Sequence, residues 1–132
     1  PSSYYVSGYP RGCQKNVMAI RFADVLLMNA EANNEMGNAA LATTRLNQVR
    51  TRAGLSATTA TDQAGLRTAI WNERRLELAM ENDRYFDVIR QGRAATVFGP
   101  KGWIANKNEL WPIPYNEILL SGGKLTQNQG YN

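Results

Sequence analysis

The sequence predicts an all-α fold made of helical hairpins and followed by an irregular C-terminal tail. Apolar residues recur at three- and four-residue spacing through most of the first 97 residues, which is the period of a helix buried along one face. Gly and Pro become frequent after residue 98, which excludes a long helix there. Hydrophobic residues make up 43% of the 132 residues, and this is enough for a packed core.

Three ranges organise the chain. Residues 1–16 are rich in Tyr, Ser, Gly and Pro, and they predict an extended entry segment. Residues 17–97 form the predicted helical domain. Residues 98–132 form the irregular tail, which we expect to pack on the helices, with a short helical turn near residues 115–120.

The first hairpin is expected from two helices, at about 17–36 and 39–53. Gly37 and Gly54 end them, because glycine accepts the left-handed backbone that closes many helices. The second helix carries an apolar stripe of Ala42, Leu46 and Val49. The apolar face of the first helix is predicted to include Phe22, Val25, Leu26, Asn29, Ala30, Asn33 and Met36.

Two more helices follow a polar loop. The third is expected from about 63 to 80, and the carboxylate of Asp62 is placed to cap its first amides. The fourth is expected from about 83 to 91 and stops at Gly92. The sequence near Asn82 leaves open whether the junction is a kink or a turn.

The first helix pair resembles one tetratricopeptide repeat. Ala30, Gly37, Ala42 and Leu46 fall where that motif places small and apolar residues, and small residues let crossing helices approach closely. Asn33 departs from the aromatic residue expected at its offset. Such repeats need about three copies for stability, so we interpret the chain as part of a longer protein.

The charge pattern indicates ion pairs within the fold. The net charge is +4, and the arginines between residues 45 and 93 alternate with acidic residues. Nucleic-acid binders cluster their basic residues, so we expect no nucleic-acid partner. Cys13 is the single cysteine and there is no histidine. We therefore expect no disulfide within the chain, no histidine triad, no metal site and no cofactor.

Glu73 and Glu77 lie one turn apart in the apolar face of the third helix. The same face is predicted to hold Leu66, Ala69, Ile70, Leu76 and Met80. A buried carboxylate must be paired or neutralised. We favour structural ion pairs, and the candidate partners are Arg21, Arg50, Arg52, Arg84 and Arg90.

The alternative for Glu73 and Glu77 is an acid/base pair of a glycoside-processing enzyme. Glycosidases place two carboxyl groups about 5 Å or more apart on either side of a bond. Two glutamates on successive turns point the same way instead. We therefore predict no catalytic residue.

The tail holds one candidate for sugar contact. Trp103, flanked by Gly102 and Asn106, could offer its ring face to a pyranose, although an anchor over the helices is the interpretation we favour. Trp111 is interpreted as an anchor. Tyr85, Phe86 and Ile89 are interpreted as the packing face of the fourth helix.

Four groups of residues follow one another along the chain. They are Ile20–Ala32 with Asn34, Glu35 and Gly37; Leu46–Arg50 with Arg52–Leu55; Glu73–Ala79 with Arg84–Asp87; and Trp111–Pro114 with Leu125–Asn128. Together and in this order, they resemble the C-terminal region of SusD/RagB-family proteins. One departure is Gln129, where the family often has Pro.

The resemblance implies a surface-exposed outer-membrane lipoprotein of a Gram-negative bacterium, without enzymatic activity. Such proteins bind oligo- or polysaccharides or other nutrients and cap a SusC-like TonB-dependent transporter. It also implies attachment through a lipid anchor absent from this fragment, and ligand contacts mostly outside these residues. A helical-repeat scaffold that binds only a protein partner stays open as an alternative.

Overall fold

The computed structural model describes residues 19–131, and this part of the chain contains helices and no strand. The all-α prediction is therefore confirmed. The chain divides into two compact units between Ala79 and Met80, inside the range 17–97 that the sequence analysis treats as one domain. The predicted entry segment 1–16 and the first two residues of the predicted first helix lie outside the described residues.

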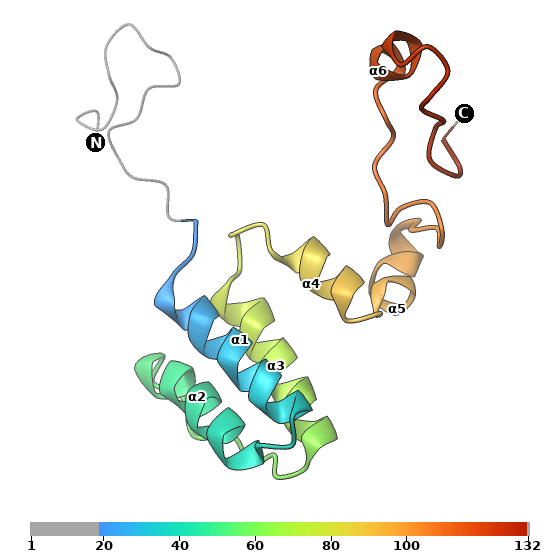
Figure 1. Cartoon of the computed structure of the whole chain (residues 1–132). Helices are drawn as coiled ribbons and strands as arrows, with labels where there is room; N and C mark the ends of the chain where they lie inside the picture. Colours follow the sequence, from blue (N-terminus) through green and yellow to red (C-terminus); the bar gives the residue numbers. More distant parts are fainter. Residues whose placement is uncertain (1–18, 132) are drawn as a thin grey trace, which may run out of the picture. The chain divides into compact units, whose positions relative to one another are not determined.

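The first unit contains α1 (Phe22–Glu35), α2 (Ala39–Arg52) and α3 (Gln63–Glu77). All three helices contact one another, and α1 lies between α2 and α3 (Figure 1). Gly37 follows α1 with φ at 82°, and the next amide, of Asn38, donates to the Asn33 carbonyl at 2.8 Å. Gly54 closes α2 in the same way, so both predicted helix ends are confirmed.

The core of the first unit lies between the three helices. The predicted stripe of α2 is confirmed, because its three apolar residues are buried. Ala30 and Ala42 are fully buried, which fits the close approach that small residues allow at a helix crossing. The fully buried large apolar side chains of this unit are Leu27, Leu46, Val49, Leu66 and Ile70.

The predicted face of α1 is partly wrong. Phe22 is 73% exposed, and Val25 and Met36 are exposed as well. Apolar residues occur on more than one side of α1, so spacing alone did not decide which side is buried. The buried residues of α1 are Ala23, Leu27, Ala30, Asn33 and Asn34.

The predicted face of α3 needs a similar correction. Asp62 caps the helix as expected, accepting from the Gly65 amide at 2.8 Å. The helix ends at Glu77, and Leu76 and Met80 are exposed. On the helical wheel, the buried face of α3 is centred between Leu66 and Ile70. Arg74 therefore lies on the buried face, and Leu76 lies outside it.

The junction near Asn82 is a turn. Met80 and Asn82 both have a positive φ, at 71° and 69°. A left-handed backbone at two positions cannot continue a helix, because side chains there clash with the backbone. The alternative of a kinked continuous helix is thereby excluded.

The second unit contains short helices joined by irregular segments. They are α4 (Arg84–Arg90), α5 (Ala94–Phe98) and α6 (Tyr115–Leu120), with a 3₁₀ turn at Gly99–Lys101. The helical turn expected at 115–120 is confirmed by α6, whereas α5 was not predicted. Figure 1 shows the long irregular stretches on either side of α6.

Side-chain amides hold these irregular stretches together. Pro112 and Pro114 flank Ile113, so Ile113 has the one backbone N–H of this Pro-Ile-Pro segment. Gln127 accepts from that N–H and donates to the Ile113 carbonyl, both at 2.8 Å. Asn128 donates to the Trp111 carbonyl at 2.6 Å. The Trp-Pro-Ile-Pro and Leu-Thr-Gln-Asn segments are therefore bonded to each other.

Candidate ligand-binding pocket

The two glutamates of α3 form ion pairs with two arginines of α2 and with Arg21, the residue that precedes α1. Glu73 accepts from Arg50 at 2.6 Å, and its side chain is 4% exposed. Glu77 accepts from Arg52 at 2.6 Å and from Arg21, which also donates to the Glu77 backbone carbonyl. Each pair joins α3 to another segment of the first unit. These ion pairs compensate the negative charge of both carboxylates, which are largely removed from water in the folded protein.

The other two predicted partners lie in α4, in the second unit. Arg90 forms an ion pair with Asp87 at 2.8 Å. Arg84 is the first residue of α4 and is half-buried. The ion pairs of Glu73 and Glu77 described above come from Arg21, Arg50 and Arg52.

Sequence reasoning missed one buried pair. Arg74 is buried and donates to Asp24 of α1 at 2.6 Å. The face predicted for this helix does not include Arg74. A wheel centred between Leu66 and Ile70 would have found Arg74, and the acidic residue at 24 is in the first turn of α1.

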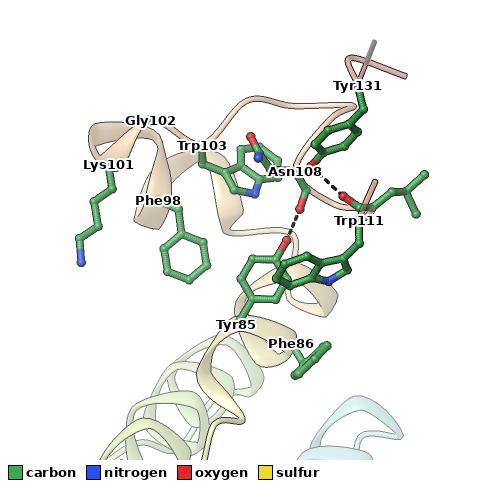
Figure 2. A pocket seen from close by; sticks show the side chains of 10 residues that line it. Tyr85, Phe86, Phe98, Lys101, Gly102, Trp103, Asn108, Trp111 and Tyr131 are labelled. Atoms are coloured by element: carbon green, nitrogen blue, oxygen red, sulfur yellow. Dashed lines mark hydrogen bonds between the residues drawn. The ribbon is translucent and has the colours of Figure 1, made fainter. Parts of the chain in front are cut away.

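An open pocket of about 500 Å³ lies in the second unit. This volume is within the range of about 300–1,000 Å³ that is typical of small-molecule sites. Its lining residues all fall between positions 85 and 131 (Figure 2). They are Tyr85, Phe86, Phe98, Lys101, Gly102, Trp103, Asn108, Leu110, Trp111 and Tyr131.

Aromatic rings form most of this lining. Tyr85 and Phe86 come from α4, and Phe98 ends α5. Tyr85 stacks on Phe98 with ring centres 5.8 Å apart, meets Phe86 edge-on at 5.7 Å, and lies 6.4 Å from Trp111. These distances are those of favourable ring pairs. Tyr85 is therefore in contact with the rings of Phe86, Phe98 and Trp111 and lies at the centre of this aromatic group.

The chain reaches Trp103 through a tight turn. Gly102 has φ at 88°, a conformation that a side chain would strain. The Trp103 amide then donates to the Phe98 carbonyl at 3.2 Å. This turn places the indole in the lining, next to Asn108 (Figure 2).

Hydrogen bonds fix the polar edge of the pocket. The Tyr85 hydroxyl donates to the Asn108 backbone carbonyl, and the Tyr131 hydroxyl donates to the Leu110 carbonyl at 3.0 Å. Asn108 Oδ1 accepts from the Ile104 amide at 2.6 Å, which leaves the side-chain NH₂ group as a donor. The Trp103 indole nitrogen is buried and has no hydrogen-bond partner among the described residues.

The pocket brings together residues that the sequence analysis had separated. Trp103, the weak candidate for sugar contact, lies in its lining. Trp111 was interpreted as an anchor, yet it lines the same pocket and is 74% exposed. Phe86 was assigned to a packing face and is also exposed. The buried side of α4 is formed by Asp87 and Val88 instead.

The described residues, 19–131, lack both a membrane-spanning helix and a metal-binding cluster. No helix there is long and apolar enough to cross a membrane. The same residues hold no group of three or more Cys, Asp or Glu side chains that could bind a metal ion.

Most of the chain matches one known protein family. Residues 5–108 match the model of the SusD family. The chain belongs to the SusD family. Curated relatives from Formosa agariphila agree: SusD-like protein P38 is 33% identical over 88% of this chain, and SusD-like protein P25 is 37% identical over 88%. The chain spans about a quarter of the length of these SusD-like relatives, 25% in both cases.

Solved structures of SusD-like proteins share the fold. A SusD-like protein from Bacteroides fragilis is 31% identical, with a TM-score of 0.76 over 96% of this chain and 28% of its own. A protein described as a laminarin-binding SusD-like protein is 41% identical, with a TM-score of 0.80 over 96% of this chain and 26% of its own. The SusD-type helical architecture is therefore shown at both the sequence and the structural level.

Proposed function

We propose that the protein binds glycans at the surface of a Gram-negative bacterium, as the capture component of a nutrient-uptake system. The observation that carries this proposal is the 41% identity and the TM-score of 0.80 to a SusD-like protein described as laminarin-binding. The ligand we propose is an oligo- or polysaccharide. The protein would hold the glycan and leave its bonds intact.

The proposal includes location and partner. A SusD-like protein that captures nutrients would be held on the outer membrane by a lipid anchor and would face the medium. It would deliver its glycan to a SusC-like TonB-dependent transporter. The described residues contribute a helical scaffold closed by ion pairs, a suitable frame for a protein that contacts both a ligand and a partner.

The decisive experiment is glycan binding by the protein at its full natural length. We expect calorimetry to detect binding of laminarin or of another neutral polysaccharide in a panel, with no release of reducing ends over hours. Copurification from outer membranes is expected to bring down a TonB-dependent transporter.

Two results would contradict the proposal. Absence of binding across the panel, with the transporter still copurifying, would favour a scaffold that binds only a protein. Release of shorter glycans would favour an enzyme, provided that a Glu73→Gln variant lost that release and kept its melting temperature.

A further inference from the structure

The aromatic pocket of the second unit has the chemistry of a sugar site. A pyranose with equatorial hydroxyls carries a flat apolar face of C–H groups and a rim of hydroxyls. It is recognised by an exposed ring face next to a few hydrogen-bonding groups, since an apolar pocket with few polar groups is the usual form of a ligand site. The pocket offers both features.

The apolar part is supplied by Trp111 and Tyr85. Trp111 is exposed, and its ring lies tilted by 54° against Tyr85, so the two rings form an angled wall. Tyr85 is itself held by its stack on Phe98 and by its bond to the Asn108 carbonyl. A wall that is fixed before binding loses little side-chain freedom when a ligand arrives.

The polar part is supplied by Trp103 and Asn108. The buried Trp103 N–H has no acceptor among the described residues, and an unpaired buried donor is unfavourable. Asn108 keeps its NH₂ group as a second donor of the same lining. A sugar hydroxyl in the pocket would accept from the Asn108 NH₂ group. It would also accept from the Trp103 N–H after a movement of the indole that exposes this atom, and the buried donor would then be paired.

The aromatic wall of the pocket is uncharged, although two lysines lie near its edge. None of the lining residues is acidic, and Lys101 is the basic residue among them. Lys107 Nζ lies 5.0 Å from the centre of the Tyr131 ring, which is also part of the lining. Figure 2 shows the Lys101 side chain directed away from the aromatic rings, and the rings of Trp111 and Tyr85 offer an uncharged surface that suits the C–H face of a neutral sugar.

We propose that this pocket is a subsite for a neutral pyranose with equatorial hydroxyls. Trp111 is the platform under the C–H face, Tyr85 is the side wall, and Trp103 and Asn108 are the hydroxyl donors. The inference rests on the proposed function, since it names one place at which the captured glycan is held.

The test uses the protein at its full natural length and a neutral glucan hexasaccharide that binds the parent in calorimetry. Trp111→Ala is expected to weaken that binding tenfold or more, because a large contact face is lost. Trp103→Phe keeps a ring but removes the N–H, and a loss of roughly two- to tenfold is expected. The matched control is Tyr115→Ala, since Tyr115 is an aromatic of the same unit, 70% exposed and outside the lining. It should bind like the parent.

A second measurement does not depend on the folding of any variant. In the parent protein, the indole N–H signal of Trp103, assigned by its loss in Trp103→Phe, should shift on addition of the hexasaccharide. The Trp71 signal should not move, because Trp71 already donates to Glu31 at 2.9 Å.

The outcomes separate the two claims. If no glycan of the panel binds the parent, the proposed function fails. If the hexasaccharide binds but the Trp103 signal stays fixed and folded Trp111→Ala binds like the parent, the subsite fails and the proposed function stands. In that case the rings serve to pack against another part of the protein.

Discussion

The two units of the molecule are stabilised by different interactions. In the first, helices are joined by arginine–carboxylate pairs between residues far apart in the sequence, such as Arg50 with Glu73 and Arg74 with Asp24. In the second, irregular segments are joined by side-chain amides and tyrosine hydroxyls bonded to backbone carbonyls. Charged pairs thus join regular elements, and neutral groups replace the backbone bonds that proline-rich segments cannot make.

The difference has an energetic consequence. Glu73 has left water almost entirely, so its partner cannot be removed without leaving a buried charge. The amide groups of the second unit are uncharged. Removing one of their hydrogen bonds lowers stability by the contribution of that bond and by the desolvation of the acceptor that is left without a donor. Single substitutions should therefore affect the first unit more strongly than the second.

The largest effect is expected from Arg50→Met. It leaves the Glu73 carboxylate buried without its partner, and the free energy of unfolding should fall by about 3–5 kcal/mol. Chemical denaturation followed by circular dichroism measures the change. The control is Arg75→Met, because Arg75 is an exposed arginine of α3, the helix that carries Glu73, and it should change stability by about 0.5 kcal/mol or less.

A double variant sharpens the same prediction. Replacing Glu73 by Leu in the Arg50→Met background removes the buried charge and should recover most of the lost stability. If the single variant were as stable as the parent, the account of Glu73 as a carboxylate dependent on its arginine would be wrong.

An intermediate effect is expected from Gln127→Glu in the second unit. The glutamate keeps the size of the side chain but cannot donate to the Ile113 carbonyl. The segment from Trp111 to Pro114 should open more easily, by about 1–3 kcal/mol. Hydrogen exchange at the Ile113 amide reports this opening. Gln129→Glu, a neighbouring substitution outside this bonded pair, should leave that exchange rate unchanged.

The sequence predicted the first unit better than the second, for a physical reason. The helix ends at Gly37 and Gly54 follow from the conformational freedom of glycine. The apolar stripe of α2 follows from the three- and four-residue spacing of its apolar residues. The buried side of α1 did not follow, since apolar residues surround the helix and packing decides between them. Arg74 was missed because the true face of α3 is turned slightly from the assumed centre.

The pocket could be predicted only in part. Trp103 was named from its type and its polar neighbours. Its grouping with Tyr85 and Trp111 depends on the turn at Gly102 and on the tyrosine hydroxyl bond to the Asn108 carbonyl. Such contacts produce no periodic pattern in the sequence from which they could be predicted. The amide bridge from Gln127 to Ile113 belongs to the same class, although Gln127 and Ile113 both lie in segments that resemble the family.

The smallest effect is expected at an exposed pair of the first unit, which tests whether burial or charge makes the difference. Arg67 donates to Glu35 at 2.7 Å, and both side chains are accessible to solvent. That hydrogen bond lowers the pKa of Glu35 below its usual range. A carboxyl group with a lowered pKa in the folded state contributes stability above its unfolded pKa and loses it as the pH falls through the folded pKa.

Arg67→Gln should therefore lower the melting temperature slightly at pH 7, and the difference from the parent should vanish in acid below the range where Glu35 titrates. The difference should also shrink when salt is raised, because exposed pairs are screened and contribute little. Thermal melts of both proteins across this pH range measure it. An effect at neutral pH as large as that of Arg50→Met would show that the charge pair itself, and not its removal from water, makes the first unit sensitive.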